Sequence, residues 1–64
     1  MILRFKTKRN GNGWRRYLAL DTDKKVFTTE CPRMIMDGEE ITTAAIRNIR
    51  ETAEHAGFTE TDAF

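Results

Sequence analysis

The chain has few of the residues that stabilise small domains through covalent bonds or metal ions. Its 64 residues include one cysteine, Cys31, and one histidine, His55. One cysteine cannot form a disulfide within the chain, and a structural zinc site needs about four Cys or His ligands. Small domains usually rely on disulfides, metals or a partner subunit to supplement a small core. We therefore expect no metal and no cofactor, and self-association remains as a means of burying more surface.

Long apolar runs are also missing. No stretch approaches the roughly 18 apolar residues that a membrane span requires. Residues 1–9 (MILRFKTKR) lack the apolar core of a signal peptide. A single cysteine without an export signal is typical of proteins in a reducing compartment. These features predict a cytoplasmic protein without a membrane partner.

Acidic residues are absent from the first twenty positions, which carry six basic side chains. Residues 21–64 hold five basic and ten acidic side chains, so the formal net charge of +1 conceals a basic first third and an acidic remainder. Such an asymmetry of charge indicates a partner for the basic part, with nucleic acid as one class.

Residues 2–20 have the pattern of a β-hairpin. Residues 2–9 alternate between two faces, and residues 14–20 are rich in strand-forming side chains. The segment NGNG (residues 10–13) suits a tight turn, because Asn and Gly adopt positive φ more readily than other residues. The sequence therefore predicts two antiparallel strands joined by this turn.

The turn also predicts the register of the hairpin. Pairing the two ends of NGNG places the apolar side chains on one face and most basic ones on the other. The predicted pairs are Leu3 with Leu20 and Phe5 with Leu18 on one face, and Arg4 with Ala19, Lys6 with Tyr17 and Lys8 with Arg15 on the other. A slip of one residue would scatter the apolar side chains, which favours this register.

A third strand is predicted over residues 26–30, and it ends before Pro32, which cannot donate a hydrogen bond to a sheet. A two-residue loop before this strand would place Phe27 opposite Leu18 and facing inward. A three-residue loop would turn Val26 inward instead. We favour the first alternative, because Phe27 buries more apolar area.

A helix is predicted between Thr42 and Gly57. Thr42 is a typical N-cap residue, and Gly57 followed by Phe58 is typical of a Schellman ending. The predicted apolar stripe consists of Ala45, Ile46, Ile49, Ala53 and Ala56. This stripe is suited to cover the apolar face of the sheet.

Together the elements predict one α+β domain over residues 1–58. Its architecture is a three-stranded antiparallel meander with one C-terminal α-helix packed on one face. The segment MIM (residues 34–36) fits either a short fourth strand or an apolar loop. Residues 59–64 are polar and acidic and are predicted to form a mobile tail.

The face of the sheet away from the helix carries basic side chains beside an aromatic ring. Such a surface suits contacts to phosphate combined with base stacking, and sheets also enter DNA grooves. An alternative interpretation is a charged face that only keeps the sheet soluble. The predicted binding site for DNA or RNA consists of Arg4, Lys6, Lys8, Arg15 and Tyr17.

A second hypothesis is a protein-interaction or self-associating module. Trp is frequent at the centres of interfaces, and Met adapts to irregular binding surfaces. The candidate residues are Trp14, Met34 and Met36. Alternatively, Trp14 covers the end of the core and the two methionines fill its edge under the helix. A partner could be a second copy of the chain or another protein.

Catalysis is not predicted. The only nucleophile–base pair of the Cys–His type would be Cys31 with His55. Cys31 lies at the end of a predicted strand, whereas His55 lies at the far end of the predicted helix. We therefore expect a protein that is not an enzyme.

Residues 5–22 (FKTKRNGNGWRRYLALDT) resemble small proteins of Gram-positive bacteria and their mobile elements. In those proteins a KT…NGN…YLxxDT hairpin precedes a helix that ends in Gly-Phe, as Gly57-Phe58 does here. The resemblance implies a hairpin and a C-terminal helix, and no activity is assigned to this group. The order of elements is also similar to that of the DNA-binding domains of transposon integrases.

Overall fold

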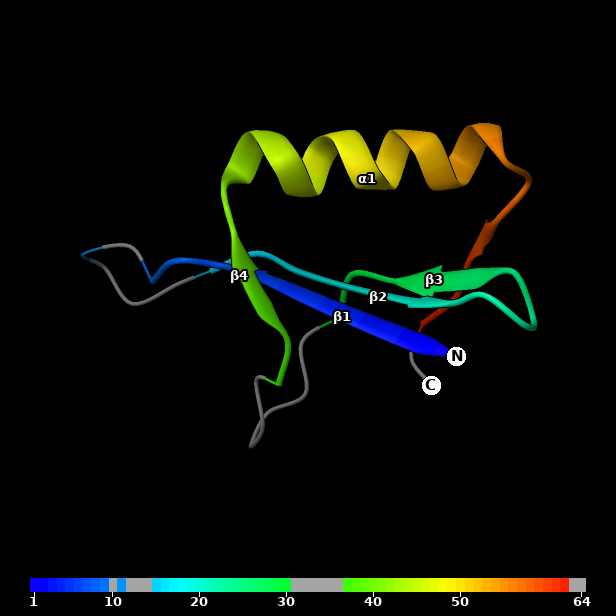
Figure 1. Ribbon diagram of the computed structural model, residues 1–64, viewed down its shortest axis with the longest axis horizontal. Coiled ribbons are helices and arrows are strands. Elements are labelled where there is room, and N and C mark those ends of the chain that lie inside the picture. Colours follow the sequence, from blue (N-terminus) through cyan, green and yellow to red (C-terminus); the bar gives the residue numbers. More distant parts are fainter. Residues whose placement is uncertain (10, 12–14, 31–36, 63–64) are drawn as a thin grey trace.

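The computed structural model describes residues 1–9, 11, 15–30 and 37–62, which form one sheet and one helix (Figure 1). The strands are β1 (Ile2–Thr7), β2 (Tyr17–Asp21), β3 (Val26–Thr28), β4 (Glu39–Ile41) and β5 (Thr59–Glu60), and the helix is α1 (Thr43–His55). The helix lies across one face of the sheet and leads from β4 to β5 (Figure 1). No helix among these residues combines the length and the apolar character of a membrane span.

The sheet has five strands in the order β4-β1-β2-β3-β5. The β1–β2 and β2–β3 pairs are antiparallel, whereas β4 is parallel to β1 and β5 is parallel to β3. The predicted α+β class, with one helix packed on the sheet, is confirmed. The predicted three-stranded antiparallel sheet is wrong in strand number and direction, because α1 connects two additional parallel strands at opposite edges. The segment 34–36, predicted as a strand or loop, lies outside the described residues.

The register of the first hairpin is as predicted. Leu3 pairs with Leu20, Phe5 with Leu18 and Lys6 with Tyr17. The hairpin continues one step beyond the strands, since the Thr7 N–H donates to the Arg16 carbonyl oxygen over 3.0 Å. The Arg16 N–H in turn donates to Thr7 Oγ1 over 2.8 Å. These bonds fix the backbone of Arg16 beside the end of β1.

The predicted pairing of Phe27 is wrong by two residues. Phe27 lies opposite Leu20 rather than Leu18, and Asp21 lies opposite Val26. The loop between β2 and β3 therefore contains four residues rather than two. A shift of two residues keeps a side chain on the same face of a sheet. Phe27 consequently still points inward and is only 2% exposed.

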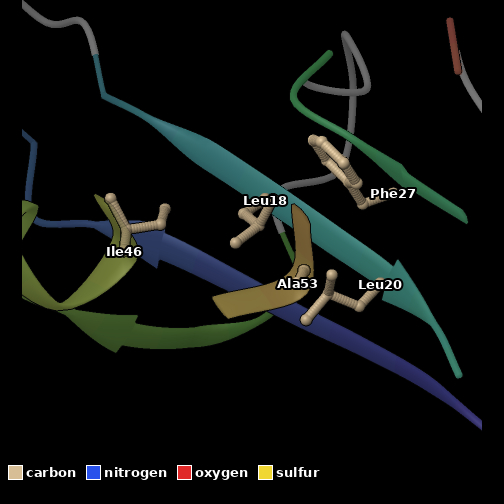
Figure 2. Packing of buried hydrophobic residues seen from close by; sticks show 5 residues of the cluster. All are labelled: Leu18, Leu20, Phe27, Ile46 and Ala53. Atoms are coloured by element: carbon tan, nitrogen blue, oxygen red, sulfur yellow. The ribbon is translucent and has the colours of Figure 1, made fainter. Parts of the chain in front are cut away.

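The core lies between the sheet and α1. Leu18, Leu20 and Phe27 contribute the sheet side, and Ile46 and Ala53 contribute the helix side (Figure 2). Four half-buried side chains complete the cluster: Phe5, Ile41, Ile49 and Phe58. Burial of this apolar surface is the main favourable contribution to folding.

The two predicted ends of the helix are confirmed. Thr42 is the N-cap, and its Oγ1 accepts a hydrogen bond from the Ala45 N–H over 3.1 Å. At the other end Gly57 has a φ of +93°, and the Phe58 N–H donates to the Ala53 carbonyl oxygen over 2.9 Å. The Gly57 N–H donates to the Glu54 carbonyl oxygen, which completes the Schellman motif.

The last strand falls in the segment that the sequence predicted as a tail. The Thr59 N–H donates to the Lys25 carbonyl oxygen over 3.1 Å, and the Thr61 N–H donates to the Phe27 carbonyl oxygen over 2.8 Å. The Schellman ending directs the chain back toward β3, where these bonds form. Residues 59–61 are therefore part of the sheet edge.

The Asp21 carboxylate organises the four-residue loop after β2. Its Oδ1 accepts hydrogen bonds from the backbone N–H groups of Asp23 over 3.0 Å and Lys24 over 3.2 Å. Hydrogen bonds to a carboxylate favour its ionised form. The bond from Lys24 has the largest effect, and the pKa of Asp21 lies below its ordinary value of 3.8.

Replacing Asp21 with Asn is expected to destabilise the protein at about pH 6, and the destabilisation should shrink as the pH falls below 3.8. The unfolded chain takes up a proton at Asp21 at a higher pH than the folded chain does. The stabilisation is therefore complete above pH 3.8 and is lost as the pH falls through the lowered pKa. Thermal melts of both proteins across this range measure the effect. A difference in Tm that does not change with pH would contradict it.

Candidate functional site

The predicted basic face is only partly present. Arg4 and Lys8 are exposed, whereas Lys6 is half-buried. Arg4 and Lys6 alternate with the inward-facing Leu3 and Phe5, so they lie on the sheet face away from α1. Lys8 follows the end of β1.

Tyr17, predicted as a surface for base stacking, is buried. Its exposed fraction is 5%, and every residue of β2 is buried. Tyr17 is in register with Lys6, at the start of β2. Tyr17 therefore does not offer its ring to a ligand, and the prediction of its exposure is wrong.

Strand β4 introduces acidic side chains beside β1. Glu40 is in register with Lys6, and Glu39 is in register with Phe5. Neighbouring residues on adjacent strands share a face, so the carboxylate of Glu40 lies on the same face as Lys6. The positive potential of the predicted face is correspondingly reduced.

The residues of the second hypothesis, Trp14, Met34 and Met36, lie outside the described residues. The protein-interaction alternative therefore stays a prediction. The large apolar side chains that are exposed in the described part of the chain are Met1, Ile2 and Leu3. Ile2 and Leu3 point to opposite faces of β1, so they do not form one continuous patch.

A more concentrated basic site lies between the sheet and the first turns of α1. Here a cavity of about 350 Å³ opens beside the start of β2 and the end of β3. We call it the arginine cavity. Its lining comprises Arg15, Arg16, Arg47 and Arg50 together with Tyr17, Leu18, Thr29, Thr43 and Ile46.

Two separate elements position these arginines. Arg47 and Arg50 are three residues apart on α1, so they lie on the same side of the helix. Arg15 and Arg16 directly precede β2, where the hydrogen bonds between Thr7 and Arg16 hold the backbone. The arginines that line the cavity therefore come from both the helix and the hairpin.

Acidic groups partly neutralise Arg50. Its Nε lies 3.3 Å from Glu54 Oε1, and one of its terminal nitrogens lies 3.4 Å from Glu60 Oε1. Its guanidinium carbon also lies 5.9 Å from the centre of the Phe27 ring, within the range of a cation–π contact. These contacts orient Arg50 and reduce its availability to a ligand.

Arg15 and Arg47 differ from Arg50 in this respect. Neither forms an ion pair with a carboxylate of the described residues. Arg47 is exposed and Arg15 is half-buried. The arginine cavity therefore keeps a positive charge that can bind an anion.

No family model, curated protein or solved structure matches this chain. The resemblance to small proteins of Gram-positive bacteria and mobile elements stays a prediction. A function must therefore be argued from the arrangement of the chain's own side chains. Among the described residues, no group of three or more His, Cys, Asp or Glu side chains is placed to hold a metal ion.

The sequence predicted one residue of the arginine cavity, Arg15, as a basic binding residue. Arg47 and Arg50 lie off the predicted apolar stripe of the helix, and neither was predicted to bind a ligand. One signal that could have identified them is their spacing of three residues next to Ile46, which places both on one side of the helix beside the core. Their approach to Arg15 depends on where α1 lies on the sheet, which the sequence alone does not specify.

Proposed function

We propose that the protein is a small non-enzymatic module that binds nucleic acid through phosphate contacts at the arginine cavity. One observation carries the proposal. Arginines from α1 and from the segment just before β2 line a single cavity, and two of them, Arg15 and Arg47, have no carboxylate partner in the described part of the chain.

The chemistry of arginine supports phosphate as the ligand. The planar guanidinium offers two parallel N–H donors that match two oxygens of a phosphate group, and it stays charged at every physiological pH. Exposed Lys8 and Arg9 follow β1 next to the hairpin residues of the cavity and extend the basic surface. Binding of this kind releases counterions and weakens steeply as the salt concentration rises.

The burial of Tyr17 affects the expected mode of binding. Without an exposed aromatic ring in the described part of this site, base stacking contributes little, and the phosphates supply most of the affinity. Binding through phosphates discriminates weakly between base sequences. We therefore propose a module that binds with little sequence preference.

Reversing the charge at the cavity provides the test. The Arg47→Glu variant is expected to bind a labelled oligonucleotide about tenfold or more weakly than the parent at low salt, because one phosphate contact becomes a repulsion. Fluorescence anisotropy titrations measure the affinity. Arg47 is exposed, so the Tm should change little.

Two variants of matched charge serve as comparisons. Lys24→Glu reverses a charge in the exposed loop at the opposite end of β2 and should leave binding close to that of the parent. Arg4→Glu reverses a charge on the sheet face away from α1. A loss of binding in Arg4→Glu but not in Arg47→Glu would move the site to that face. Failure of the parent to bind any oligonucleotide at low salt would contradict the proposed function.

A further inference from the structure

The arginine cavity is a half-open hollow rather than a flat surface. Its volume of about 350 Å³ falls at the lower end of the range of small-molecule sites, about 300–1,000 Å³. The internal phosphates of a long strand follow one another along its backbone, and proteins usually bind them in an extended groove. A cavity of this size suits one phosphate group with the sugar attached to it.

The charge of the lining distinguishes two kinds of phosphate. An internal phosphodiester carries one negative charge and two free oxygens. A phosphomonoester carries a charge of about −1.5 to −2 at pH 7 and three acceptor oxygens. Arg15 and Arg47, which lack a carboxylate partner among the described residues, supply two positive charges and two pairs of parallel donors. Their combined charge and donors match the phosphomonoester more closely.

The remaining lining fits the same ligand. Thr43 is the first residue of α1, so the positive N-terminal end of the helix lies at the cavity, and the first turn contains no acidic residue. Leu18 and Ile46 form an apolar part of the wall. Apolar walls lower the local dielectric constant and strengthen the attraction between an anion and the guanidinium groups.

We propose that the arginine cavity binds a phosphomonoester, the terminal phosphate of a nucleic-acid strand, in preference to internal phosphodiesters. The inference rests on the proposed function, which makes the end of a strand the expected carrier of this group. A free nucleoside monophosphate carries the same group, and the experiment separates the two sources.

Competition against one labelled strand tests the preference. The competitors are a decamer with a terminal phosphate, at the 5′ or the 3′ end, and an undecamer with hydroxyl groups at both ends. Each carries ten phosphate groups, so the comparison separates the terminal group from the number of phosphates. At about 50 mM salt, either the 5′-phosphorylated or the 3′-phosphorylated decamer is expected to compete about tenfold more strongly than the undecamer. Nucleoside monophosphate and inorganic phosphate are tested alone as further competitors, and each is also titrated directly by calorimetry.

Variants connect the preference to the cavity. In Arg47→Gln the phosphorylated decamer and the undecamer should compete about equally, so the ratio of their competing strengths should fall to about one. Arg4→Gln, on the opposite face, should keep the ratio of the parent. A ratio that persists in Arg47→Gln would overturn the assignment to the arginine cavity. Thermal melts of both variants check that the fold is retained.

The outcomes separate this inference from the proposed function. Equal competition by decamer and undecamer would overturn the terminal preference and leave nucleic-acid binding intact. Binding of the nucleoside monophosphate without binding of any strand would support a phosphomonoester site with a free nucleotide as its source, and would overturn the proposed function. An absence of binding to every probe would overturn both.

Discussion

The Gly38→Ala variant is expected to lose about 3 kcal/mol of its free energy of unfolding. Gly38 has a φ of +144°, a backbone conformation that residues with a side chain rarely adopt. A Cβ atom at this position would also lie 2.8 Å from the carbonyl oxygen of Arg4 in β1. Because the obstacle is backbone rather than a mobile side chain, the clash can be relieved only by moving β4 away from β1. Chemical denaturation of the parent and the variant measures the loss.

Gly57→Ala is the matched control for this prediction. Gly57 also has a positive φ, +93°, but a Cβ atom there would meet no other atom within 4 Å. The variant should therefore lose only the cost of the left-handed conformation, about 1–2 kcal/mol. Equal losses in the two variants would show that close packing of Gly38 against β1 contributes nothing to stability.

The Leu18→Ala variant is expected to lose about 3 kcal/mol, within the range of about 2–5 kcal/mol for buried leucines. Leu18 is 1% exposed and lies at the centre of the cluster between β2 and α1 (Figure 2). A domain of this size has a total stability of only about 3–10 kcal/mol. The variant should therefore lose about a third or more of the total stability, and thermal melts followed by circular dichroism should show a clearly lower Tm.

Leu3→Ala provides the comparison for Leu18→Ala. Leu3 lies on the same face of the sheet, but it is 36% exposed at the start of β1. The same truncation there removes less buried surface and leaves no enclosed cavity, so the loss should be about 1 kcal/mol. If the two variants were equally stable, the core would have to lie elsewhere than between β2 and α1.

The parts of the fold that the sequence predicted are those with strong local determinants. The NGNG segment and the alternation of residues 2–9 predicted the register that β1 and β2 adopt. Thr42 and Gly57 specified the two ends of α1. Each of these signals acts over a few residues, so it can be recognised without knowing the rest of the structure.

Strands β4 and β5 have no such local signal. They contain three and two residues, which is too short for an alternating pattern to be recognised. Glu39 and Glu40 instead fitted the acidic residues that often precede a helix. Both strands exist because they pair with β1 and β3, which are more than thirty residues away in the sequence. The position of Phe27 was missed for a related reason, since a loop of four residues is as compatible with the sequence as one of two.

In the candidate site, too, the features that depend on local sequence were predicted and those that depend on tertiary structure were not. The basic residues of the first hairpin are evident from the sequence, and Arg15 does line the cavity. The contribution of Arg47 depends on the crossing of α1 over the sheet, and the burial of Tyr17 is seen only in the folded structure. Both are consequences of tertiary structure, which charge and periodicity do not reveal.

The shortness of the two outer strands affects how the molecule behaves beside other copies of itself. A long unpaired strand at a sheet edge recruits strands from neighbouring molecules and promotes aggregation. Here β5 covers β3 with two residues, and β4 covers the second half of β1 with three. The helix that carries the basic cavity thus also supplies, at its two ends, the short segments that limit such strand addition.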